Sequence, residues 1–149
     1  MESIDKFKEI CQPKKKVSTD VVMVRLFYRK ISIYFTYVFI KLGISANQIS
    51  VLGLIFGFLG SLSISFKGSL LPGIGLVLLQ MSFIFDCSDG EVARYNRLKE
   101  EKDSINLSGS YLDAMGHLVV QPSMIFFFGL GLMHYLPSES WLLIVLAFI

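Results

Sequence analysis

Three long apolar segments without a formal charge constrain the fold of this chain more than any other feature. They cover Asn47 to Phe66, Ser69 to Phe85 and Leu118 to Leu136. A helix of about 20 residues crosses the roughly 30 Å hydrocarbon layer of a bilayer, and each segment is close to that length. The pattern therefore predicts an all-α membrane protein built around a bundle of transmembrane helices.

The segments on either side define the expected domain organisation. Residues 1–19 are polar and are expected to form a solvated cytoplasmic tail, or one drawn to anionic lipid headgroups by Lys14–Lys16. Residues 45–149 form the expected transmembrane domain. The last apolar segment, Trp141 to Ile149, reaches only about 14 Å as a helix and cannot span. We therefore expect a C-terminally truncated chain with three full spans and part of a fourth.

Residues 20–43 combine apolar and polar positions at helical spacing. Arg25, Arg29, Ser32 and Thr36 form one polar stripe, and the other positions are mainly apolar. This favours an amphipathic helix lying in the membrane interface with its apolar face toward the acyl chains. The alternative is an additional tilted span beginning at Ile31, which would reverse the orientation of the following spans.

The distribution of Lys and Arg predicts the orientation. Nine of the fourteen precede the first apolar segment, four lie between the second and third, and only Lys67 lies between the first and second. Positive residues accumulate on the cytoplasmic side, so we expect the N-terminus and a long loop from Tyr95 to Leu107 to be cytoplasmic. Cys11 and Cys87 then share a reducing compartment, and no disulfide is expected.

Acidic and small residues gather where the second apolar segment ends, in the run D-C-S-D-G-E-V-A-R from Asp86 to Arg94. Asp86 and Asp89 are three residues apart and share a helix face. Charged residues at the end of a span are costly and therefore indicate function. Glu91 lies between the patterned positions and is expected to be solvated.

A second polar stripe begins the third apolar segment. Gly109, Asp113 and His117 are spaced at i, i+4 and i+8, so they share one helix face. Two facing stripes of carboxylates favour a hard cation, Mg²⁺ or Mn²⁺. Arg94 offers a planar donor pair suited to a phosphate, while Gly90, Ala93 and Gly109 leave room for a bulky ligand. Together these residue types are typical of metal-assisted attack on a phosphoryl group.

The pattern D-x-x-D-G-x-x-A-R followed by G-x-x-x-D resembles the signature of the CDP-alcohol phosphotransferases, membrane enzymes of phospholipid synthesis. The resemblance implies a six-helix fold of which this chain holds the N-terminal half, and a homodimer. Asp86, Asp89 and Asp113 would hold a metal pair on the diphosphate of a CDP-linked donor. Gly90, Ala93, Arg94 and Gly109 would line the nucleotide-phosphate pocket. An acceptor alcohol would attack the phosphorus bound to the donor's alcohol and release CMP.

The chain departs from that family pattern at three places. The separation of Arg94 from Gly109, positions 95–108, is longer than usual in the family. His117 stands where the family has its last aspartate, and Ala46-Asn47 stands where Pro-Asn is frequent. A neutral imidazole can accept a hydroxyl proton, so His117 is expected to act as the base, as a weaker metal ligand, or to mark altered activity.

Two other functions stay open from sequence. One is a cation-coupled transporter or channel whose acids bind the permeating ion, and the other is a catalytically silent relative of the family. Transporter sites usually lie near the bilayer midplane, whereas Asp86 and Asp89 lie at the end of their span. No nucleic acid partner is indicated. The donor, either CDP-diacylglycerol or a soluble CDP-alcohol, and the acceptor alcohol are not fixed by these residues.

Overall fold

The computed structural model describes residues 4–13, 22, 24–100 and 107–134. Within these ranges the chain forms helices and no strand: α1 (Ile4–Cys11), a π-helical turn η1 (Val24–Tyr28), α3 (Arg29–Lys41), α4 (Ala46–Ile64), α5 (Leu70–Glu100) and α6 (Leu107–Leu132). Three stretches in α4, α5 and α6 are long and apolar enough to cross a membrane, namely Ala46–Ile64, Leu70–Lys99 and Ala114–Leu132. The protein is therefore an all-α, multi-pass membrane protein, as the sequence predicts.

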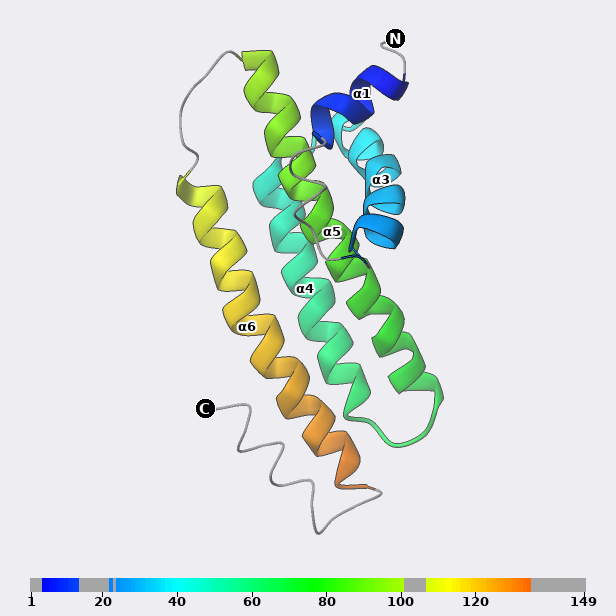
Figure 1. The fold of residues 1–149 in the computed structure, drawn as a ribbon. Coiled ribbons are helices and arrows are strands. Elements are labelled where there is room, and N and C mark those ends of the chain that lie inside the picture. Colours follow the sequence, from blue (N-terminus) through cyan, green and yellow to red (C-terminus); the bar gives the residue numbers. More distant parts are fainter. Residues whose placement is uncertain (1–3, 14–21, 23, 101–106, 135–149) are drawn as a thin grey trace.

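The three long helices lie side by side, and α4 packs against both α5 and α6 (Figure 1). The chain runs in one direction along α4 and α6 and in the opposite direction along α5. Large apolar side chains such as Val77 and Leu118 are exposed on the outside of this bundle, which suits contact with lipid. Helices α1 and α3 pack on the half of α5 that precedes Glu100 (Figure 1).

Small residues let α4 and α5 approach closely, as the Gly53-x-x-x-Gly57 spacing predicts. A Cβ built at Gly57 would lie 2.9 Å from Ser82 Oγ of α5 and 2.8 Å from a Val120 methyl of α6. The Ser82 hydroxyl donates to the Gly53 carbonyl at 2.8 Å. Tight packing at these positions fixes the spacing of the three long helices.

A capping box fixes the start of α4. Ser45 is the N-cap, and its side chain accepts a hydrogen bond from the backbone N–H of Gln48. The Gln48 side chain accepts in return from the Ser45 backbone N–H at 2.9 Å, which completes a capping box. Pro122 lies inside α6.

An aromatic cluster joins α3 and α4 to α5. The Phe85 ring lies 6.0 Å from Phe35, 5.6 Å from Phe39 and 5.2 Å from Phe56, centroid to centroid, in edge-to-face geometry. Phe85 immediately precedes Asp86 in the chain, so this cluster anchors the part of α5 that carries the first acidic residue.

Two boundary predictions are wrong within the described residues. The expected tail is in part the helix α1, whose Phe7 and Cys11 are buried against α3 and α5. Its residues 14–19, like the partial fourth span at 141–149, lie outside the described residues. The expected loop from Tyr95 to Leu107 is helical to Glu100, because Arg, Leu, Lys and Glu are strong helix formers.

The polar stripe of residues 20–43 exists, but it faces the protein. Arg29, Ser32 and Thr36 are buried, whereas Tyr34 and Val38 of the same helix are exposed. The apolar positions of α3 therefore cover its outer side. Whether this side contacts acyl chains in the interface stays a prediction, and the Arg25 side chain lies outside the described residues.

Candidate functional site

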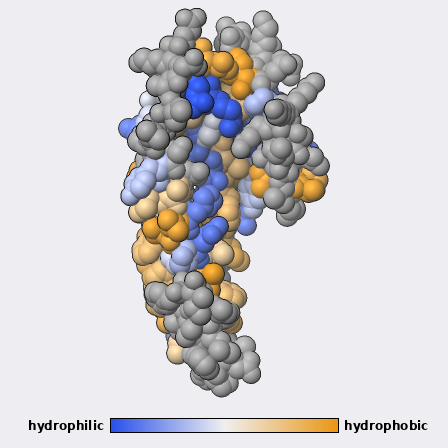
Figure 2. Space-filling view, turned by 60° about the vertical axis from the view of Figure 1, so that its left-hand side comes forward, coloured by the Kyte–Doolittle hydropathy of each residue, from blue (hydrophilic) through white to orange (hydrophobic). Residues whose placement is uncertain are grey.

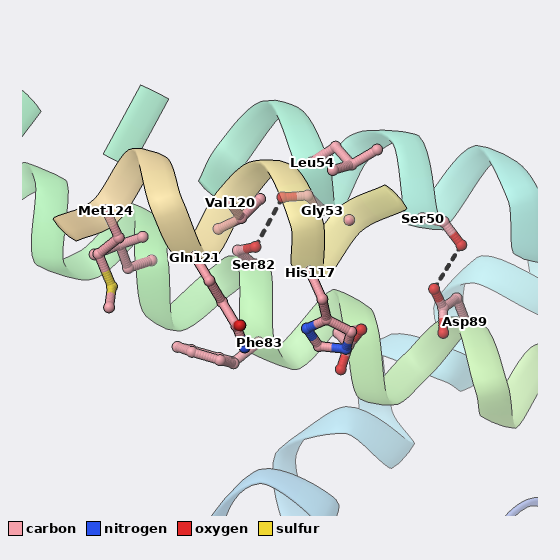
Figure 3. A pocket seen from close by; sticks show the side chains of 13 residues that line it. Ser50, Gly53, Leu54, Ser82, Phe83, Asp89, His117, Val120, Gln121 and Met124 are labelled. Carbon is pink, nitrogen blue, oxygen red and sulfur yellow. Dashed lines mark hydrogen bonds between the residues drawn. The ribbon is translucent and has the colours of Figure 1, made fainter. Parts of the chain in front are cut away.

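A cleft opens between α4, α5 and α6 and contains several of the predicted site residues (Figure 3). Its cavity volume is about 70 Å³, which is room for several water molecules at roughly 10–15 Å³ each. The lining comprises Ser50, Gly53, Leu54, Leu79, Ser82, Phe83, Asp86, Asp89, Gly116, His117, Val120, Gln121 and Met124. Polar groups thus meet along one stretch of an otherwise apolar cleft.

Asp86 and Asp89 both line this cleft from α5, as their i, i+3 spacing predicts. Asp86 is exposed and Asp89 is half-buried. The Ser50 hydroxyl of α4 donates a hydrogen bond to the Asp89 carboxylate at 2.5 Å (Figure 3). This bond orients the Asp89 carboxylate. Ser50 was not predicted from the sequence, because helical periodicity alone does not indicate which residue of α4 faces Asp89.

His117 enters the same cleft from α6. Figure 3 shows its imidazole extending from α6 toward α5, with the Gln121 side chain one turn further along on the same side. Gly116, beside it, also lines the cleft, and a Cβ there would touch Leu54 at 3.6 Å. The structure therefore brings together Asp86, Asp89 and His117, which the sequence placed on two facing stripes.

Asp113 and Gly109 lie on α6, as expected, but their side-chain surroundings lie outside the described residues. Among the side chains that the structure describes, no group of three or more His, Cys, Asp and Glu is close enough to hold one metal ion. Asp86 and Asp89 nevertheless supply carboxylate oxygens to one cleft, which are the ligands that Mg²⁺ and Mn²⁺ prefer. The donor chemistry of the cleft therefore fits a hard divalent cation.

Arg94 lies two turns beyond Asp86 on α5. It contacts Cys11, the last residue of α1. Its Nε donates to the Cys11 carbonyl at 2.7 Å. Its guanidinium lies over Gly90, since a Cβ there would be 3.4 Å from one terminal nitrogen and 3.9 Å from the other. Gly90, Ala93 and Arg94 are half-buried. They do not line the cleft itself and lie beyond Asp89 on α5.

Glu91 corrects the prediction of a solvated side chain, because it is fully buried. It pairs with Arg29 at 3.0 Å and accepts further hydrogen bonds from Gln12, Ser32 and Thr36. The stripe of donors on α3 is the sequence feature that indicates such a buried acceptor. Cys11 and Cys87 are free cysteines, as expected.

The surface around the site is divided by polarity. Figure 2 shows hydrophilic surface in the upper part of the molecule, with hydrophobic surface flanking it and extending below. Along α5, Asp86 lies about 24 Å and Asp89 about 28 Å from Leu70 at 1.5 Å per residue. A hydrocarbon layer of roughly 30 Å that begins at Leu70 would therefore end near these two carboxylates.

Comparison with protein-family models and with characterised proteins yields no match for this chain.

Proposed function

We propose that this protein is a metal-dependent membrane transferase that moves a phosphoalcohol group from a CDP-linked donor to an acceptor alcohol and releases CMP. One observation carries the proposal: Asp86 and Asp89 of the D-x-x-D-G-x-x-A-R run line a cleft that His117 enters from the neighbouring helix. Two carboxylates and an imidazole at the edge of an apolar cleft suit chemistry on a charged, amphiphilic substrate.

Asp86, Asp89 and Asp113 are the residues that would hold Mg²⁺ or Mn²⁺, with His117 as an additional ligand or as the base. Such cations, when bound, neutralise the charge of a diphosphate and stabilise charge that develops at phosphorus. They would also offset the repulsion between carboxylates at the membrane edge. Ser50 holds the Asp89 carboxylate in place for this role.

Phosphate recognition is proposed for the continuation of the cleft along α5. Gly90 has no side chain, and the Arg94 guanidinium lies directly over it, so a phosphate could approach the backbone and the guanidinium together. Gly109, on the neighbouring helix α6, and Ala93 would complete a pocket of small residues.

The reaction would begin when the acceptor hydroxyl gives its proton to His117 and attacks the phosphorus that carries the donor's alcohol. A new phosphorus–oxygen bond to the acceptor forms, and the bond to the CMP oxygen breaks. The site is proposed to face the cytoplasm, because α1, α3 and the charged end of α5 lie together, opposite Lys67.

The test is CMP release by the full-length protein reconstituted in liposomes, with Mg²⁺ or Mn²⁺ and a panel of CDP-linked donors and acceptor alcohols. We expect release that requires the metal, disappears in Asp86→Asn and survives in His117→Asp. Lys67→Ala, at the opposite end of the bundle, is the matched control and should retain full activity. Absence of CMP with every donor and acceptor would refute the proposal, and metal flux without CMP would favour a transporter.

A further inference from the structure

Glu91 is a buried charge with four side-chain hydrogen bonds, and it lies outside the cleft. Its side chain is fully buried. One carboxylate oxygen accepts from Gln12 at 2.8 Å, Arg29 at 3.0 Å and Ser32 at 2.7 Å, and the other accepts from Thr36 at 2.7 Å. One guanidinium and three neutral donors therefore provide partners for both carboxylate oxygens of this buried side chain.

These bonds connect three parts of the chain. Arg29, Ser32 and Thr36 belong to α3, whereas Gln12 follows directly after α1. The Gln12 amide also donates to the Arg29 carbonyl at 2.6 Å. Removal of any donor leaves part of a buried charge unsatisfied, which is costly. The end of α1 is therefore fixed against α5 through Glu91.

The same end of α1 holds Arg94. The Cys11 carbonyl, one residue before Gln12, accepts from Arg94 Nε at 2.7 Å. With Nε used in this way, the terminal nitrogens of the guanidinium lie over Gly90. Glu91 and Arg94 are one turn apart on α5 and contact adjacent residues of the segment that ends α1.

We propose that Glu91 is a positioning residue for Arg94. It acts through Gln12, which sets the position of the Cys11 carbonyl and thereby the orientation of the guanidinium over Gly90. This inference rests on the proposed function, in which Arg94 binds a phosphate of the donor. Helix α1 is then part of the donor site, although none of its described side chains lines the cleft.

The test uses Gln12→Ala, which breaks the connection to α1 and leaves the Glu91 bonds to α3 in place. Donor-dependent CMP release should show a KM for the donor that rises about tenfold, the factor that one hydrogen bond to a charged group is worth. The kcat should stay within about twofold, because the groups at the reacting phosphorus are untouched. Glu91→Gln should move KM in the same direction. Lys8→Ala, an exposed position on α1, should leave both constants unchanged.

A second measurement does not depend on activity. Cys11 is fully buried, and burial, with a smaller contribution from the Glu91 charge, raises the pKa of its thiol to about 12. Maleimide labelling, resolved from Cys87 by peptide mass spectrometry, should be slow in the wild type and in Lys8→Ala. In Gln12→Ala the labelling of Cys11 should be faster by about tenfold.

The two proposals fail in different ways. Wild-type protein that releases no CMP refutes the proposed function. Active wild-type protein with an unchanged donor KM in Gln12→Ala, or with a loss confined to kcat, overturns the positioning role. Labelling of Cys11 at the wild-type rate in Gln12→Ala also overturns it, because α1 would then be held without Glu91.

Discussion

A close approach of the α4 and α5 backbones at two glycines makes a sharp stability prediction. Gly60 and Gly75 face each other across this pair. A Cβ built at Gly75 would lie 2.7 Å from the Gly60 carbonyl oxygen, 3.0 Å from an Ile64 side-chain carbon and 3.1 Å from the Ser63 Cβ. The first neighbour is backbone and cannot rotate away. Gly75→Ala must therefore push the two helices apart.

Overpacking of this kind costs about 1–3 kcal/mol, while replacing Gly by Ala inside a helix contributes up to about 1 kcal/mol in the opposite direction. Gly73→Ala is the matched control, because it lies on the same helix with nothing within 4 Å of the added Cβ. The propensity gain is similar in both variants and cancels. Gly75→Ala should therefore be less stable than Gly73→Ala by about 1–3 kcal/mol.

The assay is reversible unfolding in mixed micelles by titration with sodium dodecyl sulfate, followed by circular dichroism. Gly57→Ala should fall between the two variants, because its added Cβ would meet the side chains of Val120 and Ser82, which can shift. Equal stability of Gly75→Ala and Gly73→Ala would refute the close helix packing on which the geometry of the cleft depends.

Four further predictions concern single contacts. Ser50→Ala should weaken the apparent affinity for Mn²⁺ at least tenfold in the CMP-release assay, because it removes the hydrogen bond that orients Asp89. Glu91→Ala should lower the free energy of unfolding by about 3–5 kcal/mol, since it removes the carboxylate that pairs with the buried Arg29 guanidinium. Adding Arg29→Met should recover part of the loss. Ser45→Ala should cost about 1 kcal/mol in the same titration, because it removes the N-cap of α4. Stability should also fall as the pH rises above 9.0, because the Cys11 thiol ionises near 9.0 when unfolded but only at about 12 when folded.

Each of these has a contrary outcome. An unchanged Mn²⁺ requirement in Ser50→Ala would mean that Asp89 needs no orientation. A double variant of Arg29 and Glu91 less stable than Glu91→Ala would show that the pair is not the source of the loss. An unchanged free energy of unfolding in Ser45→Ala would argue against the N-cap of α4. If Cys11→Ser keeps the same decline above pH 9.0, another group is responsible.

The membrane bundle was predictable because each span depends on local sequence. Long uncharged segments must form helices in lipid, where every backbone group needs an internal partner. The first uncharged segment begins at Asn47, and α4 begins one residue earlier, at Ala46. The end of α5 was not predicted correctly. The charged residues after Tyr95 suggested a loop, but they are strong helix formers and the helix continues to Glu100.

The site was predictable where periodicity alone places residues on one face. Asp86 and Asp89 share a face in any α-helix. His117 lines the same cleft because α5 and α6 both pack against α4. Ser50 and Glu91 depend on which face of one helix meets which face of another. The sequence does not determine that relation, although three spaced donors on α3 could have indicated a buried acceptor.

The proposed transfer can be followed through the phosphorus atom that carries the donor's alcohol. A CDP-linked donor labelled with ³²P at that phosphorus is incubated with the reconstituted protein, Mn²⁺ and an acceptor alcohol. The proposed chemistry predicts that the label moves to the acceptor while the released CMP stays unlabelled, and that Asp86→Asn abolishes both products. Label that stays in the donor under every metal condition, or a transfer that persists in Asp86→Asn, would refute the proposed metal-dependent transfer.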